Sequence, residues 1–170
     1  MLDKKLNPMD VIVFYGKPYN PLHRLISWRT LEDAIHCVTV RSVSESEILV
    51  YDIDFNGFHL QPLLPEYSGW NCTIHRYAHT IDYDKLIAWC DNRHYASKGY
   101  TSFKQWFMSY TLGLMTKSLC ADENRWTCAE LPYWCFQQNR YPLTTKEETL
   151  PMPREFRFNP LFEKVFEGEL

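Results

Sequence analysis

The sequence predicts an α+β domain in which an antiparallel β-sheet packs against helices. Short β-branched runs bounded by turn residues fill the first half of the chain, whereas apolar residues at helical spacing dominate the second half. With 45% hydrophobic and 16% aromatic residues and six glycines among 170 residues, the composition is that of a packed globular protein. We expect a single domain over residues 1–170, with a core at about 10–140 and an extended C-terminal strap at 141–170.

The strands expected in the first half are short runs rich in β-branched residues. The run DVIVF ends before a glycine and a proline, which predicts a strand followed by a turn. The next two runs are separated by the polar stretch SVSES, which has the composition and length of a hairpin loop. Prolines and a glycine separate the last two runs. The expected strands span residues 10–14, 34–40, 48–55, 57–60 and 73–77.

The helices expected in the second half rest on apolar residues that recur at helical spacing. Such stripes predict helices at residues 86–90, 103–110 and 128–138, and a short helix or turn is expected earlier, at 22–28. We interpret the stripes as core-facing, because apolar stripes of this kind usually pack inside the protein. The proline-rich stretch after Tyr141 predicts the strap, with a mobile tail as the alternative.

The charge and the hydropathy pattern exclude several classes of partner. A formal net charge of -3 and a sequence pI of about 6.1 provide no basic surface for a phosphate backbone, so we expect no nucleic-acid partner. We also expect no transmembrane segment, because no stretch approaches roughly 18 consecutive apolar residues. No export signal is evident, which favours a cytoplasmic protein, or one released by lysis or carried in a virion. The sequence leaves the oligomeric state open.

The cysteines indicate free thiols rather than disulfides or a metal site. A chain of this length without an export signal is expected to keep its thiols reduced. There is no Cys-x-x-Cys pair and no Cys/His cluster at finger spacing, so we expect no metal and no other cofactor. The six cysteines are Cys37, Cys72, Cys90, Cys120, Cys128 and Cys135.

Cys128 is the cysteine that the sequence places best for chemistry. Pro132 follows it by four residues, and a proline is tolerated only in the first turn of a helix, so the helix is expected to begin close to Cys128. Backbone N–H groups and the dipole at a helix start favour an anion, which lowers the pKa of a thiol. The alternative is that Cys128 is a small buried apolar residue, the commoner role of a cysteine.

His36 lies within the β-branched strand AIHCVTV, where an imidazole needs a partner. If the following hairpin loop is centred on Ser44, residues whose numbers add up to 88 face each other, and Asp52 lies directly across from His36. A carboxylate there would orient the ring while its other nitrogen faces a thiolate.

Alternatives to Asp52 stay open at the level of the sequence. Asp54 lies on the same face of the strand and is the nearest substitute, whereas a register shift by one residue would present Tyr51 or Ile53. Asp52 and Asp54 are also compatible with a purely solvating role on an edge strand.

The order of these segments resembles that of the circularly permuted NlpC-type hydrolases. It consists of the strand DVIV, the strand IHCV with its internal histidine, an acidic strand followed by a glycine, and a helix opened by Cys-Ala-Glu. The family comprises papain-like thiol enzymes in which the histidine precedes the cysteine, and the YiiX-like proteins and the lecithin retinol acyltransferases look like relatives. The resemblance covers roughly residues 10–140 and depends on the order and spacing of short motifs.

The resemblance implies a papain-like fold with the nucleophile at a helix N-terminus. Carried over, Cys128 is the nucleophile, His36 is the base and Asp52 is the third polar residue. Family members often have a small hydroxyl residue before the histidine and after the cysteine, whereas Ile35 and Ala129 stand here. The third residue of the family is commonly glutamate, histidine or asparagine, so Asp52 departs from that pattern.

The implied reaction is hydrolysis of an amide bond through an acyl-cysteine intermediate. A cysteine peptidase or amidase of a bacterium or bacteriophage, acting on a peptide or a peptidoglycan stem peptide, is the family-based expectation. A lipid or thioester acyl hydrolase or acyltransferase and a non-catalytic binding module of the same fold are the alternatives.

Several residues around the nucleophile are expected to contact the substrate. Two of them, Trp126 and Tyr133, flank the nucleophile, and the aromatic-rich segment 103–115 is expected to form part of the substrate wall. The resemblance adds Asp10, which belongs to the family's opening strand, with a solvated carboxylate as the alternative. Glu130 follows the nucleophile in the first helical turn, where the dipole favours a carboxylate, and we interpret it as structural.

Overall fold

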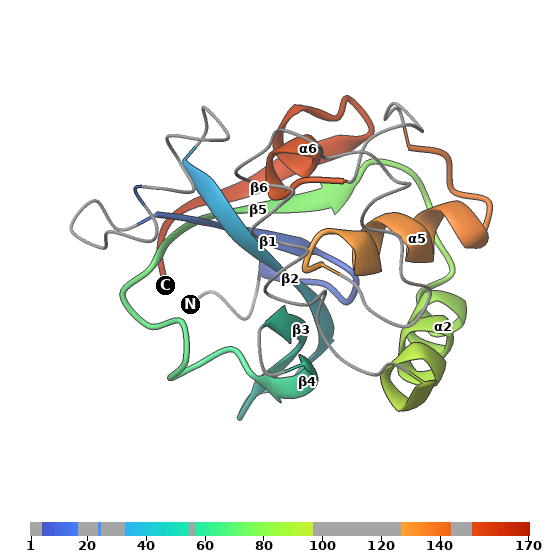
Figure 1. Cartoon of the computed structure of the whole chain (residues 1–170), viewed down its shortest axis with the longest axis horizontal. Helices are drawn as coiled ribbons and strands as arrows, with labels where there is room; N and C mark the ends of the chain where they lie inside the picture. The colour runs from blue at the N-terminus through green and yellow to red at the C-terminus, as the bar shows by residue number, and fades with distance from the viewer. Residues whose placement is uncertain (1–4, 17–23, 25–32, 55–56, 97–126, 144–150) are drawn as a thin grey trace.

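The protein is built on a six-stranded antiparallel sheet with the strand order β4-β3-β2-β1-β5-β6 (Figure 1). Helices lie against this sheet, so the expected α+β class is confirmed. The computed structural model describes residues 5–16, 24, 33–54, 57–96, 127–143 and 151–170.

The strands form where β-branched and aromatic residues are concentrated in the sequence. They are β1 (Val11–Tyr15), β2 (Ala34–Val43), β3 (Ile48–Asp54), β4 (Gly57–Pro62), β5 (Asn71–Tyr77) and β6 (Phe162–Glu169). The helices are α2 (Tyr83–Ala96), α5 (Glu130–Gln138) and α6 (Pro153–Phe158). The strands expected in the first half and the helices expected near residues 86–90 and 128–138 are confirmed, with ends that differ by a few residues.

Alternate residues of the central strand β1 face two different hydrophobic clusters. Val11 and Val13 belong to a cluster with residues of all three helices, on the side that we call the helical face. Ile12 and Phe14 belong to a cluster on the opposite side, which we call the loop face. All four side chains are fully buried. Burying each of them contributes about 1.5–3 kcal/mol to the free energy of unfolding.

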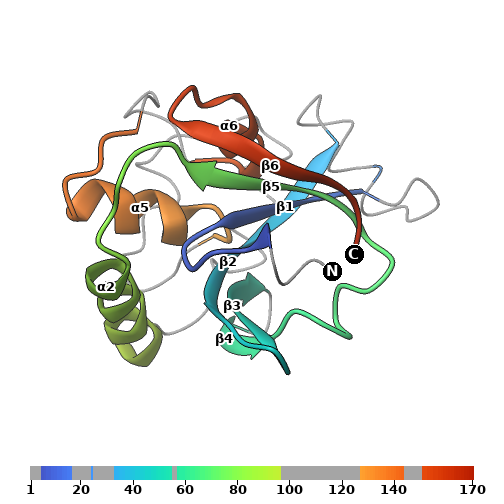
Figure 2. The same ribbon diagram turned by 180° about the vertical axis from the view of Figure 1, so that it is seen from behind.

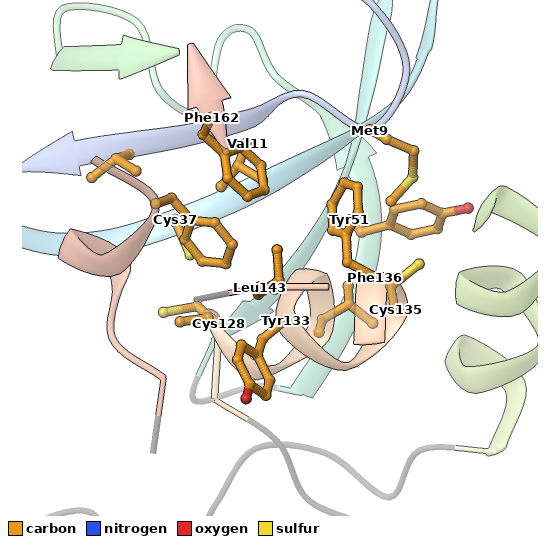
Figure 3. Packing of buried hydrophobic residues seen from close by; sticks show 14 of the residues in the cluster. Met9, Val11, Cys37, Tyr51, Cys128, Tyr133, Cys135, Phe136, Leu143 and Phe162 are labelled. Atoms are coloured by element: carbon orange, nitrogen blue, oxygen red, sulfur yellow. The ribbon is translucent and has the colours of Figure 1, made fainter. Parts of the chain in front are cut away.

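Helices α2 and α5 lie beside each other on the helical face, as the two opposite views show (Figures 1 and 2). The Cys135 thiol of α5 donates to the carbonyl oxygen of Leu86 in α2, with the sulfur 3.5 Å from the oxygen. Figure 3 shows Tyr51 of the sheet beside Phe136 of α5, within the cluster that also contains Cys128. The packing of α5 therefore holds the segment before it against the sheet.

The β2–β3 hairpin has a different register from the expected one. Thr39 faces Tyr51, so partner numbers add up to 90 rather than 88, and a bulge follows Val40. The loop lies further along the chain than expected, since the N–H of Ser44 donates to the carbonyl of Glu47 at 2.9 Å. Because the difference is two residues and side chains alternate with a period of two, each strand residue keeps its expected face.

The C-terminal segment differs from the expected extended strap. It contains α6, which has a proline in its first turn, and β6, which pairs with β5 at the edge of the sheet. The sequence pattern does not reveal β6 because its residues alternate only weakly between buried and exposed positions, as is common on an edge strand.

Some expected segments lie outside the described residues. They are the helix at 103–110, the wider segment 103–115, and the short helix or turn at 22–28 apart from residue 24. Of the helices in the described part of the chain, none has the length and apolar character needed to span a membrane.

Candidate active site

Cys128 lies in the turn that leads into α5. The helix begins at Glu130 with Ala129 as its N-cap, and Pro132 is its third residue, so the proline stands in the first turn as expected. The N–H of Glu130 donates to the carbonyl of Thr127 at 3.1 Å, which closes the turn around Cys128. Cys128 is buried, with 8% of its surface exposed, and belongs to the cluster on the helical face.

Cys128 is hydrogen-bonded to the side chains of two residues of β2, Cys37 and His36. The Cys37 thiol donates to the Cys128 sulfur, and this hydrogen bond lowers the pKa of Cys128. The charge and the hydrogen bond of His36 lower the same pKa. Although burial opposes them, these contacts hold the pKa of Cys128 well below that of an ordinary thiol. Burial, and then the contact with Cys128, raise the pKa of Cys37, so Cys37 stays a neutral donor. Figure 3 shows the two cysteines in the same cluster on the helical face.

His36 connects Cys128 to Asp52. The Nε2 atom of His36 lies 2.8 Å from Oδ1 of Asp52, whose side chain is 1% exposed. Burial lowers the pKa of His36, but the Cys128 thiolate and the Asp52 carboxylate outweigh it, so the pKa lies well above its usual value. Burial raises the pKa of Asp52, but the hydrogen bond and charge of His36 outweigh it and lower that pKa. The site therefore aligns a thiol of lowered pKa, an imidazole of raised pKa and a carboxylate of lowered pKa.

An irregularity in the β1–β2 ladder sits directly beside His36. Phe14 pairs with His36, but Tyr15 pairs with Ala34, so Ile35 is an extra residue in β2. A bulge of this kind re-aims the neighbouring side chain and explains how the His36 ring meets partners from two different elements.

The contact between His36 and Asp52 matches the expectation, although the route differs. Thr39 pairs with Tyr51 in the antiparallel ladder. The next position along the ladder therefore sets Asp52 across from Val38 rather than from His36. Asp52 reaches His36 diagonally across the strand pair, a separation that long side chains can bridge.

Two further residues, Gln61 and Tyr67, contact the carboxylate of Asp52 and were not expected from the sequence. Gln61 Nε2 donates to Oδ2 of Asp52 at 2.7 Å, and the Tyr67 hydroxyl donates to the same oxygen. The Tyr67 oxygen also lies 3.2 Å from Nε2 of His36. Gln61 is in β4 and Tyr67 is in the loop before β5. The hydrophobic pattern of the sequence singles out neither residue.

A solved structure shares this fold. The crystal structure of the metalloprotein yiiX from Escherichia coli O157:H7 (DUF1105) matches with a TM-score of 0.64 and 12% sequence identity, over 98% of this chain and 99% of that chain. The expected likeness to YiiX-like proteins is therefore supported at the level of the fold. No family model matches the sequence, and no curated protein matches it either.

Within residues 5–16, 24, 33–54, 57–96, 127–143 and 151–170, no group of three or more His, Cys, Asp or Glu side chains is arranged to hold a metal ion.

Glu130 stabilises the turn that carries the nucleophile. The N–H of Thr127 donates to Oε2 of Glu130 at 2.6 Å, so the Glu130 side chain reaches back to the segment before the helix. Burial raises the pKa of Glu130 to about 7, against the lowering effect of the Thr127 hydrogen bond. These contacts agree with the structural role expected from the sequence.

Asp10 is not brought to the site. It is buried, and Arg76 Nε and Nη2 donate to its two carboxylate oxygens at 2.9 and 2.8 Å. It precedes β1, at the opposite end of the strand from Phe14, the residue that pairs with His36. Its observed contacts tie β1 to β5 rather than offer a surface to a substrate.

The other expected contact residues contribute little surface or lie outside the description. Tyr133 is 3% exposed and its hydroxyl accepts from Gln137 Nε2 at 3.3 Å, so it packs in the core. Trp126 lies outside the described residues. Asp54, the alternative to Asp52, contacts His59 at 3.0 Å instead of His36.

Proposed function

We propose that this chain is a thiol hydrolase of the papain-like, permuted NlpC type, with Cys128 as nucleophile, His36 as base and Asp52 as the residue that orients the base. The observation that carries the proposal is the hydrogen-bonded contact of Cys128 with His36, in which the thiol pKa is low and the imidazole pKa is high. Structural cysteines in apolar surroundings have raised pKa values, so this pattern favours a reactive thiolate.

The proposed reaction begins from the thiolate–imidazolium pair. The Cys128 sulfur attacks the carbonyl carbon of the substrate, and the carbonyl electron pair moves to the oxygen. When the carbon–nitrogen bond breaks, His36 gives its proton to the leaving nitrogen and an acyl-cysteine remains. His36 then takes a proton from water, the resulting hydroxide attacks the acyl carbon, and the carbon–sulfur bond breaks to release the acid and restore the thiolate.

The geometry supports a separate role for each ring nitrogen of His36. Nε2 contacts Asp52 Oδ1 at 2.8 Å, so Nδ1 is the nitrogen left to exchange a proton with Cys128. Asp52 fixes the ring and stabilises its charged form. The backbone N–H groups at the start of α5 are the proposed donors to the oxyanion, since a helix start favours negative charge.

The proposed substrate is a peptide-like amide. This choice rests on the resemblance to the NlpC-type hydrolases and on the shared fold, which is an argument by analogy. The yiiX protein is described as a metalloprotein, but the described residues of this chain do not provide a metal-binding set, and no step of the proposed reaction uses a metal.

The proposal is tested by trapping the acyl-enzyme. The purified protein is incubated separately with peptide, glycopeptide and lipid pools, quenched in acid and digested for mass spectrometry. We expect a hydroxylamine-sensitive acyl adduct on Cys128 from the peptide or glycopeptide pool, and none in C128S. The variant C72A is a matched control, because Cys72 is also buried but lies on the loop face. An adduct from the lipid pool alone would show that the substrate is a lipid and not an amide. The absence of an adduct from every pool would contradict the proposed enzymatic activity.

A further inference from the structure

Tyr67 is held rigidly beside His36 by aromatic packing and by its loop. Its ring stacks on Phe14 with the centroids 4.2 Å apart and 13° between the ring planes, and the edge-to-face contact with Trp70 spans 6.0 Å. The backbone N–H of Tyr67 donates to the carbonyl of Leu63 at 3.1 Å. Phe14 is the register partner of His36 in the sheet, so the same strand pair positions both rings.

The direction of the hydrogen bonds around Tyr67 is fixed by chemistry. An ionised carboxylate accepts hydrogen bonds and cannot donate them, so the Tyr67 hydroxyl donates a hydrogen bond to Oδ2 of Asp52. Burial, and then the charge of Asp52, raise the pKa of Tyr67 far above that of an ordinary tyrosine, so the hydroxyl stays protonated. Its oxygen is then free to accept, and it lies 3.2 Å from Nε2 of His36.

We propose that Tyr67 is a positioning residue, which closes a ring of hydrogen bonds with Asp52 and His36 and thereby holds the proton of the imidazole on Nε2. Both groups near Nε2, the Asp52 carboxylate and the Tyr67 oxygen, are acceptors toward it, so a proton on Nε2 satisfies both. Nδ1 is then the basic nitrogen that faces Cys128. This inference rests on the proposed function, because it assigns a role in activating the same thiol.

Tyr67 differs in this respect from Gln61, the other donor to Oδ2 of Asp52. Gln61 restrains the carboxylate alone, whereas the Tyr67 hydroxyl contacts the carboxylate and the imidazole together. The other titratable groups that act on His36, Asp52 or Tyr67 are Cys37, Cys128, His59 and Glu66.

The test compares Y67F with Y77F. Y67F removes the hydroxyl but keeps the ring that stacks on Phe14. Tyr77 is a matched control, because it is buried to a similar extent and its hydroxyl donates to the carbonyl of Pro142 at 3.2 Å, away from the site. The readout is the rate of Cys128 alkylation by iodoacetamide from about pH 4.5 to pH 9, followed by peptide mass spectrometry.

We expect Y67F to slow alkylation about fivefold on the acid side of neutrality, the effect of one net hydrogen bond, while rates near pH 9 stay within about twofold. Y77F should match the unmodified protein throughout. In a D52N background, Y67F should slow alkylation less than it does in the unmodified protein, because Tyr67 and Asp52 act on the same imidazole proton and their effects are coupled. A Y67F profile identical to that of Y77F would overturn the role of Tyr67. Loss of acid-side reactivity in the unmodified protein would instead overturn the proposed function.

An independent measurement keeps the inference falsifiable if Y67F does not fold. Nitrogen-15 NMR of His36 in the unmodified protein reports which ring nitrogen carries the proton. We expect Nε2 to stay protonated in both charge states of the ring, with Nδ1 the nitrogen that titrates. A ring that loses its proton from Nε2 would contradict the inference.

Discussion

Two histidine–aspartate pairs lie close together in this sheet, and only one of them meets a thiol. The His36–Asp52 pair has its nearest atoms 2.8 Å apart, and its side chains are 17% and 1% exposed. The His59–Asp54 pair has nearly the same separation, 3.0 Å, but its side chains are 36% and 38% exposed. Residue type and distance therefore do not distinguish the two pairs.

Burial and further partners make the difference. Asp52 also accepts from Gln61 and Tyr67, and its histidine contacts Cys128 on the far side. Charges in such surroundings interact more strongly than charges exposed to water, where ion pairs contribute little. The sheet therefore carries one buried pair in contact with a thiol and a second, more exposed pair typical of a surface contact.

Replacing the histidine of each pair should produce the largest contrast. H36A removes the charge that stabilises the Cys128 thiolate and so raises the pKa of Cys128, and we expect alkylation of Cys128 near pH 6 to slow about a hundredfold. H59A should leave the rate within about twofold. Circular dichroism of each variant checks that the fold is kept. Equal effects of H36A and H59A would contradict the conclusion that only the His36–Asp52 pair acts on Cys128.

Neutralising the aspartates should produce a smaller contrast. D52N keeps the shape of the side chain but removes the carboxylate that stabilises the His36 imidazolium, and we expect alkylation near pH 6 to slow about tenfold, a free-energy difference of about 1.4 kcal/mol. D54N should have no measurable effect on Cys128. A stronger effect from D54N than from D52N would show that Asp54, and not Asp52, orients His36.

Removing the neighbouring thiol should have a still smaller effect. C37A deletes the side-chain donor to the Cys128 sulfur, and we expect alkylation near pH 6 to slow about threefold to fivefold, the range of one net hydrogen bond. C72A is the matched control, since Cys72 is equally buried at 1% but lies on the loop face. If C72A slows the reaction as much as C37A, the effect is one of packing.

Salt should have the smallest effect. Exposed ion pairs are screened by salt, whereas buried pairs are screened much less. Raising sodium chloride from about 0.02 M to about 0.5 M should therefore change the alkylation rate of Cys128 by less than about twofold. A large fall in the rate would show that the charges next to Cys128 are exposed to solvent.

Most of the sheet could be predicted from the sequence, because β-branched runs and turn residues mark the strands locally. The register of the β2–β3 hairpin could not, because the bulge after Val40 and the position of the loop depend on backbone detail that residue types do not report. The error was two residues, which preserves the face of each side chain, so the expected contact of Asp52 with His36 survived it.

The site itself was predicted in part. Pro132 reveals the helix start behind Cys128, and the internal histidine of β2 stands out among β-branched residues. Gln61 and Tyr67 carry no comparable signal, since a polar residue on an edge strand and a tyrosine in a loop are common. Their roles depend on how the chain folds back over β3, which only the structure reveals.

The central claim is that Cys128 is ionised at neutral pH because His36 and Cys37 stabilise its thiolate. An ultraviolet titration of thiolate absorbance, taken as the difference between the unmodified protein and C128S, measures this directly. Because the pKa of Cys128 is lowered, we predict that its thiolate signal persists well below pH 7 and is lost only in stronger acid. A signal that first appears near pH 8.5, as for a free cysteine, would contradict the account.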